Sequence, residues 1–374
     1  MNRNAYTQQA KRWVIKIGSA LLTKDGKGLD YEAMAKWTKQ IAHLRNQNIE
    51  VILVSSGSVA EGMSRMKWDS RPTDLAELQA AAAIGQTGLI QAYETEFNQY
   101  QIQAAQVLLT HDEVSNRKRY LNARNTLRAL LKLNALPIIN ENDTVALEEM
   151  RLGDNDTLAA LVANITEADL LLILTDQDGL FTKDPRHNED AELISEESAS
   201  NTELLSYVGK IATTLGSGGM ATKLIAAQRA AKSGCATIIA SGREDNVISR
   251  IAKGENIGTF LKPDESQLSA RKQWIASQVQ ASGSLSLDMG ASKAIQTQGT
   301  SLLPIGVVSS SGEFKRGDVV DCINPEGEVI ARGLANYSSD EVAQLFKQPS
   351  NQIAKIVGYA GDTELIHRDN LVVL

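Results

Sequence analysis

The chain has 374 residues, more than one comfortable hydrophobic core, and 43% hydrophobic residues are ample for folding, so two domains are expected. A net charge of −7 argues against a dedicated nucleic-acid binder and favours small-molecule work. No segment approaches the roughly 18 apolar residues of a membrane span, the N-terminus lacks a signal-peptide stretch, and Cys235 and Cys322 are isolated, which together predict a cytosolic protein with two reduced thiols and no zinc site.

Short β-branched runs alternate with longer helix-like segments through most of the chain. The strand-like runs are 13–18, 50–57, 102–109, 136–142, 169–176 and 236–242, and the helix-like runs are 31–47, 74–100, 118–133 and 220–234. This alternation is typical of an α/β protein with a mostly parallel sheet sandwiched by helices. Because such sheets bind ligands at the carboxyl ends of their strands, we expect the functional residues in the loops that follow them.

The composition changes after about Lys262. Residues 263–282 are polar and predict a partly helical linker, and residues 283–374 contain short strands separated by glycine-containing turns. We therefore expect a larger domain over 1–262, a linker over 263–282 and a smaller β-rich domain over 283–374.

Several strand ends carry residues suited to a phosphate or a nucleotide. Glycines there allow close backbone approach, and a helix start offers free amides. Ordinary turns with N-caps would explain each loop taken alone. The residues concerned are Lys16, Gly18, Ser56, Gly57, Thr175 and Asp176.

Two familiar phosphate-binding motifs are absent. No GxxxxGK[ST] follows a strand, and no GxGxxG lies in the first βα turn, so this is neither a P-loop enzyme nor a standard Rossmann dehydrogenase by motif. The segment SGGMATK is then a candidate anion site of another kind, because Gly218 and Gly219 expose amides while Lys223 lies near a helix start. A flexible linker with a surface lysine is the alternative, but a lysine at that place opposes the helix dipole and calls for a compensating anion.

A second polar cluster surrounds a strand end and the following helix start. Asparagine can donate and aspartate can accept, so this cluster suits the ammonium and carboxylate of an amino acid, or Mg²⁺ held through water. Either an amino acid or a metal-bound nucleotide could bind here. The alternative is a solvated turn followed by an Asn or Asp N-cap, which would account for one of the two groups of residues better than for both. The residues are Asn140, Glu141, Asn142, Asp143, Asp154, Asn155 and Asp156.

In order and spacing these motifs resemble the glutamate 5-kinase family over nearly the whole chain. The family has an amino acid kinase fold followed by a PUA domain. Two small departures occur: Ser58 stands where the family often has alanine or valine, and Ser217 where it commonly has threonine. The matching segments are VIKIGSALLT, VSSG, LLTHDEVSNRKRYLNARNTLRALL, PIINENDTV, GDNDTLAALVA, LLILTDQDGLFTKDPR, GSGGMATKLIAAQRAAKSG and SLLPIGV.

The resemblance implies ATP-dependent phosphorylation of the γ-carboxylate of L-glutamate to L-glutamyl 5-phosphate, the first step of proline biosynthesis. It assigns the ATP and glutamate sites to residues 1–262 and the PUA domain to 283–374. A carboxylate is already a competent nucleophile at neutral pH, so no general base is needed. Mg²⁺ is expected to bridge the phosphates of ATP, with protein ligands that the sequence does not identify.

The resemblance also implies roles for single residues. Lys16 and Lys223 would stabilise the transferring phosphoryl group, with Asp176 holding the two lysines in place. The residues that would bind glutamate are Ser56, Asp143, Asn155 and Asp156. The residues that would bind the nucleotide are Lys16, Gly18, Gly57, Thr175, Asp176, Ser217, Gly218, Gly219, Met220, Ala221, Thr222 and Lys223.

Partners follow from the same resemblance. L-Proline is the expected feedback inhibitor, a dimer or tetramer is the expected assembly, and glutamate-5-semialdehyde dehydrogenase is a possible functional partner. The alternatives are another amino acid kinase, acting on acetylglutamate, aspartate, carbamate or UMP, an RNA-binding protein acting through its PUA domain, or a catalytically dead amino acid sensor. The Asn/Asp cluster argues against the first, the acidic charge against the second, and the two lysines against the third.

Overall fold

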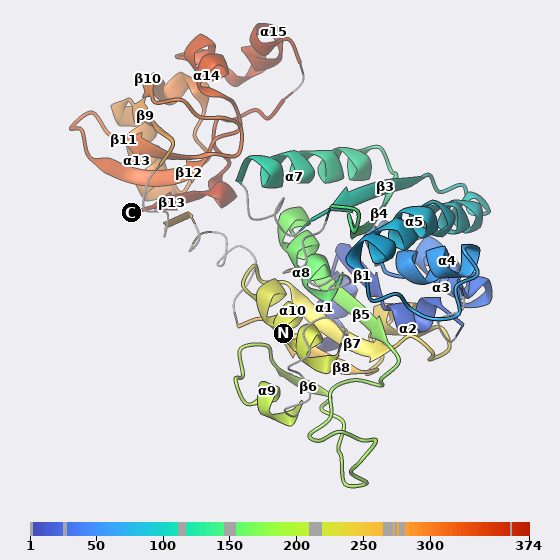
Figure 1. Ribbon diagram of the computed structural model, residues 1–374. Helices are drawn as coiled ribbons and strands as arrows, with labels where there is room; N and C mark the ends of the chain where they lie inside the picture. The colour runs from blue at the N-terminus through green and yellow to red at the C-terminus, as the bar shows by residue number, and fades with distance from the viewer. Residues whose placement is uncertain are drawn as a thin grey trace. The chain divides into compact units, whose positions relative to one another are not determined.

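The computed structural model describes residues 3–24, 28–110, 117–145, 155–208, 219–264, 272, 275–276, 281–359 and 361–374 (Figure 1). The chain divides into two compact units, Met1–Ser266 and Gln267–Leu374, each with its own buried core. Among the helices in these ranges, none has the length and apolar character needed to cross a membrane.

The first unit is built on a twisted eight-stranded sheet with strand order β3-β4-β2-β1-β5-β7-β8-β6. Neighbouring strands run parallel except for β7 and β8, which are antiparallel. The strands are β1 (Arg12–Ile17), β2 (Glu50–Ser55), β3 (Ala104–Leu109), β4 (Leu136–Glu141), β5 (Leu170–Thr175), β6 (Glu196–Ser198), β7 (Ala236–Ser241) and β8 (Thr259–Lys262).

Helices cover both faces of this sheet, and the strands β1, β4, β5 and β7 are buried almost throughout. Burial on both faces explains why these strands read as continuous apolar runs. The helices of this unit are α1 (Arg3–Gln9), α2 (Ser19–Leu22), α3 (Tyr31–Asn46), α4 (Ser58–Arg65), α5 (Leu75–Asn98), α7 (Arg117–Lys132), α8 (Asn155–Thr166), α9 (Leu204–Tyr207), α10 (Met220–Ala231) and α11 (Val247–Ala252).

Alternation along β1 decides which residues face which helices. Trp13, Ile15 and Ile17 belong to the core cluster that includes residues of α3, α5 and α11, whereas Val14 belongs to the cluster that includes residues of α8 and α10. Since side chains alternate between the faces of a strand, Lys16 points to the same face as Val14. Lys16 is therefore placed under α8 and α10, which pack against each other (Figure 1).

The second unit has a five-stranded sheet in the order β10-β9-β11-β12-β13. Its core includes Leu285, Val320, Cys322 and Tyr337, all of which are buried. The strands are β9 (Gly283–Leu287), β10 (Val307–Ser311), β11 (Val319–Ile323), β12 (Val329–Leu334) and β13 (Leu371–Val373), and the helices are α13 (Met289–Gln298), α14 (Ser339–Leu345) and α15 (Ile353–Val357), with 3₁₀ turns at Pro304–Gly306, Ser350–Gln352 and Arg368–Asn370.

The predicted fold class, an α/β parallel sheet between helices followed by a smaller β-rich unit, is confirmed. Two features of the sheet differ from the sequence reading. The strands β6 and β8 were not predicted, and they run opposite to the central strands. Both are only three or four residues long, too short for a hydrophobic period to identify them.

Candidate active site

The carboxyl ends of four adjacent strands define the site. β4, β2, β1 and β5 are neighbours in the sheet and run parallel. Parallel strands deliver their carboxyl ends to one edge, so the loops after them converge there. These loops begin at Gly18, Ser56, Asn142 and Asp176, far apart in sequence but side by side at this edge.

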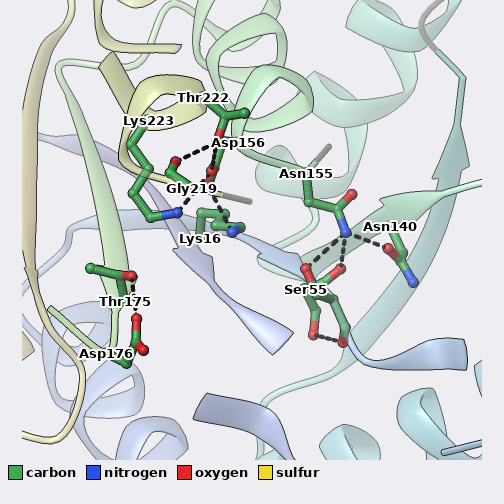
Figure 2. Close-up of polar contacts among 11 residues, drawn as sticks. Lys16, Ser55, Asn140, Asn155, Asp156, Thr175, Asp176, Gly219, Thr222 and Lys223 are labelled. Carbon is green, nitrogen blue, oxygen red and sulfur yellow. Dashed lines mark hydrogen bonds and ion pairs between the residues drawn. The ribbon is translucent and has the colours of Figure 1, made fainter. Parts of the chain in front are cut away.

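Two buried lysines share one buried carboxylate at this edge (Figure 2). The Nζ of Lys16 lies 2.7 Å from Oδ1 of Asp156, and the Nζ of Lys223 lies 3.0 Å from Oδ2. Thr222 donates its hydroxyl to the same Oδ2 at 2.7 Å. The side chain of Asp156 is 1% exposed and those of Lys16 and Lys223 are 6% and 4% exposed. With all three groups ionised, the cluster carries one net positive charge away from solvent.

The pKa values of this cluster reflect two cations against one anion. Burial alone raises the pKa of Asp156, but Lys16, Lys223 and the hydroxyl of Thr222 outweigh it and bring the pKa down to about 2. Burial lowers the pKa of Lys223, which faces one carboxylate but also the like charge of Lys16. The pKa of Asp156 falls because two cations lie beside it, whereas the pKa of Lys223 falls because its burial, together with the charge of Lys16, outweighs the carboxylates of Asp156 and Asp176. An added anion would restore the balance for the lysines.

Asp176 was expected to hold the two lysines, and the carboxylate that contacts both of them in this structure is that of Asp156. Asp156 lies at the second position of α8, where a carboxylate is favoured by the helix dipole, and α8 packs on the face of β1 that carries Lys16. Asp176 is exposed and accepts the hydroxyl of Thr175 at 3.1 Å. The ion pairs of Lys16 and Lys223 at 2.7 and 3.0 Å are made with Asp156, while the charge of Asp176 also raises the pKa of Lys223. Both carboxylate oxygens of Asp156, which was also expected to share in binding glutamate, face the lysines in this structure.

A chain of side-chain amides lies beside the lysine cluster (Figure 2). The Nδ2 of Asn155 donates to the carbonyl of Ser55 at 3.2 Å, to Oγ of Ser56 at 2.9 Å and to Oδ1 of Asn140 at 3.0 Å. The backbone N–H of Glu141 also donates to Oδ1 of Asn140 at 2.9 Å. Because a backbone N–H can only donate, it fixes the orientation of the Asn140 amide, and Asn140 in turn fixes that of Asn155.

Two buried acceptor oxygens near these amides have no hydrogen-bond donor among the described residues. Oδ1 of Asn155 and Oδ1 of Asp143 are buried and have no hydrogen-bond partner in the described part of the chain. The other oxygen of Asp143 accepts the hydroxyl of Ser58 at 3.1 Å. Buried acceptors without donors are unfavourable, so this place suits a guest that brings several N–H groups.

Helices α4 and α10 present uncapped N-termini at the same edge. Each begins after a glycine, Gly57 or Gly219, and neither start has a side-chain cap, whereas Asp30 caps α3 and Asp74 caps α5. Free first-turn amides and the helix dipole favour an anion at such ends. Gly57 has a φ of 100°, a left-handed backbone conformation that favours glycine at this position.

Gly219 is required neither by conformation nor by crowding. Its φ of −69° suits any residue, and a Cβ there would meet no atom within 4 Å. Among the described residues, none fills the space beside Gly219, and this glycine provides no side chain to cap α10. Met220, Ala221 and Thr222 form the first turn behind it, while the predicted nucleotide residues Ser217 and Gly218 lie outside the described residues.

The backbone amides around Gly18 differ in whether they have a partner within the protein. The N–H of Gly18 donates to the carbonyl of Leu174 at 3.2 Å, so in this structure it extends the pairing of β1 with β5. The amides of Ser19 and Ala20, which open α2, follow directly and have no backbone partner among the described hydrogen bonds.

The structure adds residues that sequence reasoning left out of the site. Gln86 on α5 accepts from Nδ2 of Asn140 at 2.8 Å, and the hydroxyl of Tyr93 on the same helix lies 3.0 Å from Oγ of Ser55. Asn140 was seen as part of a polar cluster but given no role. A polar residue in an alanine-rich helix was the one available signal for Gln86, and it does not tell which strand the side chain meets.

Comparisons with known proteins place this geometry in a family. Residues 11–241 match the model of the amino acid kinase family, and residues 283–357 match that of the PUA domain. A glutamate 5-kinase of Thioalkalivibrio sulfidiphilus is 61% identical over 366 residues, 98% of each chain. One from Hydrogenovibrio crunogenus is 55% identical over 373 residues, which is 100% of this chain and 99% of the relative.

The fold is shared more widely than the sequence. The crystal structure of UMP kinase from Bacillus anthracis matches with a TM-score of 0.50 at 18% identity, over 68% of this chain and 97% of that one. At that identity the likeness shows the fold alone. With two family models and full-length relatives in agreement, the chain belongs to the glutamate 5-kinases of the amino acid kinase family, with an amino acid kinase domain followed by a PUA domain.

Proposed function

We propose that this protein transfers the γ-phosphoryl group of ATP to the γ-carboxylate of L-glutamate, the first step of proline biosynthesis. A carboxylate oxygen forms the new bond to phosphorus while the bond from phosphorus to the β,γ-bridging oxygen breaks, giving L-glutamyl 5-phosphate and ADP. The carboxylate is ionised at neutral pH, so no proton has to be removed. Catalysis then depends on position and on neutralising negative charge.

The observation that carries this proposal is the pairing of two subsites on consecutive residues. Asn155 belongs to the amide chain, and Asp156 holds Lys16 and Lys223. A guest bound at Asn155 would therefore lie next to the net positive charge of the lysine cluster. That arrangement suits an amino acid whose far end receives a phosphoryl group, with both ammonium groups stabilising charge as it develops in the transition state.

The polar groups around Asn155 match the α-carbon end of glutamate. Oδ1 of Asn155 and Oδ1 of Asp143 lack donors, and an ammonium group would supply them. The hydroxyl of Ser56 accepts from Asn155, which leaves its own hydrogen available for a carboxylate oxygen. We assign Ser56, Asp143 and Asn155 to glutamate.

The open N-terminus of α10 is assigned to the phosphates of ATP. Gly219, Met220, Ala221 and Thr222 would supply backbone amides, Gly57 the start of α4, and Thr175 and Asp176 the edge of the nucleotide site. Mg²⁺ on the phosphates supplies further neutralisation of charge when bound. No group of three or more His, Cys, Asp or Glu side chains suited to a metal occurs in the described ranges, and Mg²⁺ is proposed only as a companion of the phosphates.

The biological setting follows from the same proposal. L-Proline, which also carries an ammonium and a carboxylate, is proposed as a feedback inhibitor that competes for the groups of the glutamate subsite. A cytoplasmic homodimer or homotetramer is proposed, with glutamate-5-semialdehyde dehydrogenase consuming the acyl phosphate. RNA and membranes are not among the proposed partners.

The test is ADP release with a panel of acceptors, with hydroxylamine present to trap the acyl phosphate. We expect L-glutamate to give both ADP and hydroxamate, and aspartate, N-acetylglutamate, carbamate and UMP to be much poorer. N-Acetylglutamate lacks the ammonium that the two orphaned acceptors call for. A preference for N-acetylglutamate of tenfold or more, about 1.4 kcal/mol in the transition state, would overturn the proposal.

A further inference from the structure

The hydroxyl of Ser58 donates a hydrogen bond to Asp143, a residue far away in the sequence. Ser58 is the first residue of α4, but that helix has Gly57 as its N-cap and no side-chain cap. Ser58 is 4% exposed, and its Oγ lies 3.1 Å from Oδ2 of Asp143, in the turn after β4. An ionised carboxylate only accepts, so the hydroxyl donates. The bond ties the start of α4 to the loop that carries the glutamate subsite.

One carboxylate oxygen of Asp143 is hydrogen-bonded, and the other has no partner among the described residues. The residue is 7% exposed, Oδ2 accepts from Ser58, and Oδ1 is buried without a partner among the described residues. A carboxylate free to rotate would present either oxygen to a guest. With Oδ2 held from the α4 side, rotation is restricted and Oδ1 stays directed away from Ser58, available to a donor that is missing from the protein itself.

The pKa of Asp143 reflects opposing influences. Burial raises its pKa to about 6, while the bond from Ser58 and the charge of Arg71 work in the opposite direction. Arg71 is exposed and lies in the segment between α4 and α5. Of the two groups that favour the ionised form, Ser58 is the one in direct contact.

We propose that Ser58 is a positioning residue for the substrate: it holds Oδ2 of Asp143 so that Oδ1 receives the ammonium group of glutamate. The inference rests on the proposed function, since the ammonium belongs to the proposed substrate. Ser58 touches no reacting atom in this scheme. Its influence is therefore expected on the binding of glutamate and on the pH dependence of that binding, and hardly on phosphoryl transfer once glutamate is bound.

The test is the pH profile of kcat/KM for glutamate in Ser58→Ala. Loss of the hydroxyl removes an interaction that favours the ionised carboxylate, so the pKa of Asp143 rises and the acid limb of the profile, near pH 6 in the wild type, moves to higher pH. At pH 6 we expect the KM for glutamate to rise about tenfold, because a hydrogen bond to a charged group is lost. The kcat at saturating glutamate and the KM for ATP should stay within about twofold.

Matched variants separate positioning from a structural role. Ser58→Thr keeps a hydroxyl and should restore most of the wild-type profile, whereas Ser58→Cys, a weaker donor, should shift the acid limb in the same direction as alanine. Ser64→Ala, an exposed serine on the same helix, should leave the profile unchanged. Should Ser58→Ala not fold, the threonine and cysteine profiles carry the comparison.

The proposal is overturned if Ser58→Ala, or Ser58→Cys in its place, overlays the wild-type profile. It is also overturned if kcat falls equally at every pH with an unchanged KM for glutamate. A wild-type protein that releases no ADP in response to glutamate would instead contradict the proposed function, whatever Ser58 does.

Discussion

Asp156 is the residue on which the charge balance of the site depends. Its two oxygens have different partners: Oδ1 faces Lys16, and Oδ2 faces Lys223 and the hydroxyl of Thr222. The same hydroxyl of Thr222 lies 2.7 Å from the carbonyl oxygen of Gly219. Thr222 therefore links the carboxylate of Asp156 to the glycine that precedes α10. One side chain thereby sets the distance between the two ammonium groups and their position relative to the open helix start.

We predict that Asp156→Asn destabilises the fold and abolishes activity, whereas Asp176→Asn leaves the fold intact. An amide at position 156 leaves two buried ammonium groups without a counter-charge, and removing one partner of a buried ion pair costs about 3–5 kcal/mol. Asp176 is exposed, so its replacement should change the free energy of unfolding by roughly 0.5 kcal/mol or less.

Urea denaturation of both variants, beside the wild type, measures the two free energies of unfolding. A large loss of stability in Asp176→Asn with none in Asp156→Asn would return the lysine-holding role to Asp176. Activity alone does not decide this point, because Asp176 is itself proposed to lie at the nucleotide.

At the scale of the elements, three of them meet in the amide chain. Gln86 of α5 bonds to Asn140 of β4, and Asn140 bonds to Asn155 of α8. Each amide orients the next, because Oδ1 of Asn140 is fixed by the backbone N–H of Glu141. The helix α5 thus reaches the glutamate subsite through one intermediate side chain, without lining it.

We predict that Gln86→Leu raises the KM for glutamate several-fold with little change in kcat. Nδ2 of Asn140 would lose its acceptor, which weakens the orientation of both asparagines while the lysine cluster stays in place. Gln86→Glu keeps an acceptor at that place and should retain a KM close to that of the wild type. Steady-state kinetics with glutamate varied at saturating ATP measures the effect, and an unchanged KM in Gln86→Leu would show that the orientation of Asn140 does not depend on α5.

Much of the element order could be read from the sequence. Strands buried on both faces give continuous apolar runs, and long amphipathic helices between them give a second, longer period, so the parallel sheet follows. The rule that ligands bind at carboxyl ends of strands then directs attention to Lys16, Ser56 and Thr175 without any structure.

The partners of these residues could not be read in the same way. Asp156 and Asp176 both follow or begin an element at the same edge, and the sequence does not say which carboxylate Lys16 meets. That depends on the face of β1 from which Lys16 projects and on α8 packing there. The sequence also does not show that the N–H of Gly18 donates to the carbonyl of Leu174, because that bond depends on the pairing of β1 with β5.

At the scale of the whole molecule, all of the proposed chemistry lies in the first compact unit. The residues come from places as distant in sequence as Lys16 and Lys223, and the parallel sheet brings them together. The second unit has a separate core around its own five strands. One edge of the first sheet is accordingly proposed to hold an amino acid carboxylate beside a phosphate and to join the two.

The most direct test of that claim follows the oxygen atoms. Glutamate labelled with oxygen-18 in its γ-carboxylate is turned over with unlabelled ATP and hydroxylamine, and the released phosphate is analysed by mass spectrometry. In the proposed reaction a carboxylate oxygen becomes the bridge of the acyl phosphate, and hydroxylamine attacks the carbonyl carbon, so each phosphate should leave with one labelled oxygen. Phosphate that forms in step with ADP but carries no label would mean that water, and not glutamate, accepts the phosphoryl group, and would contradict the account.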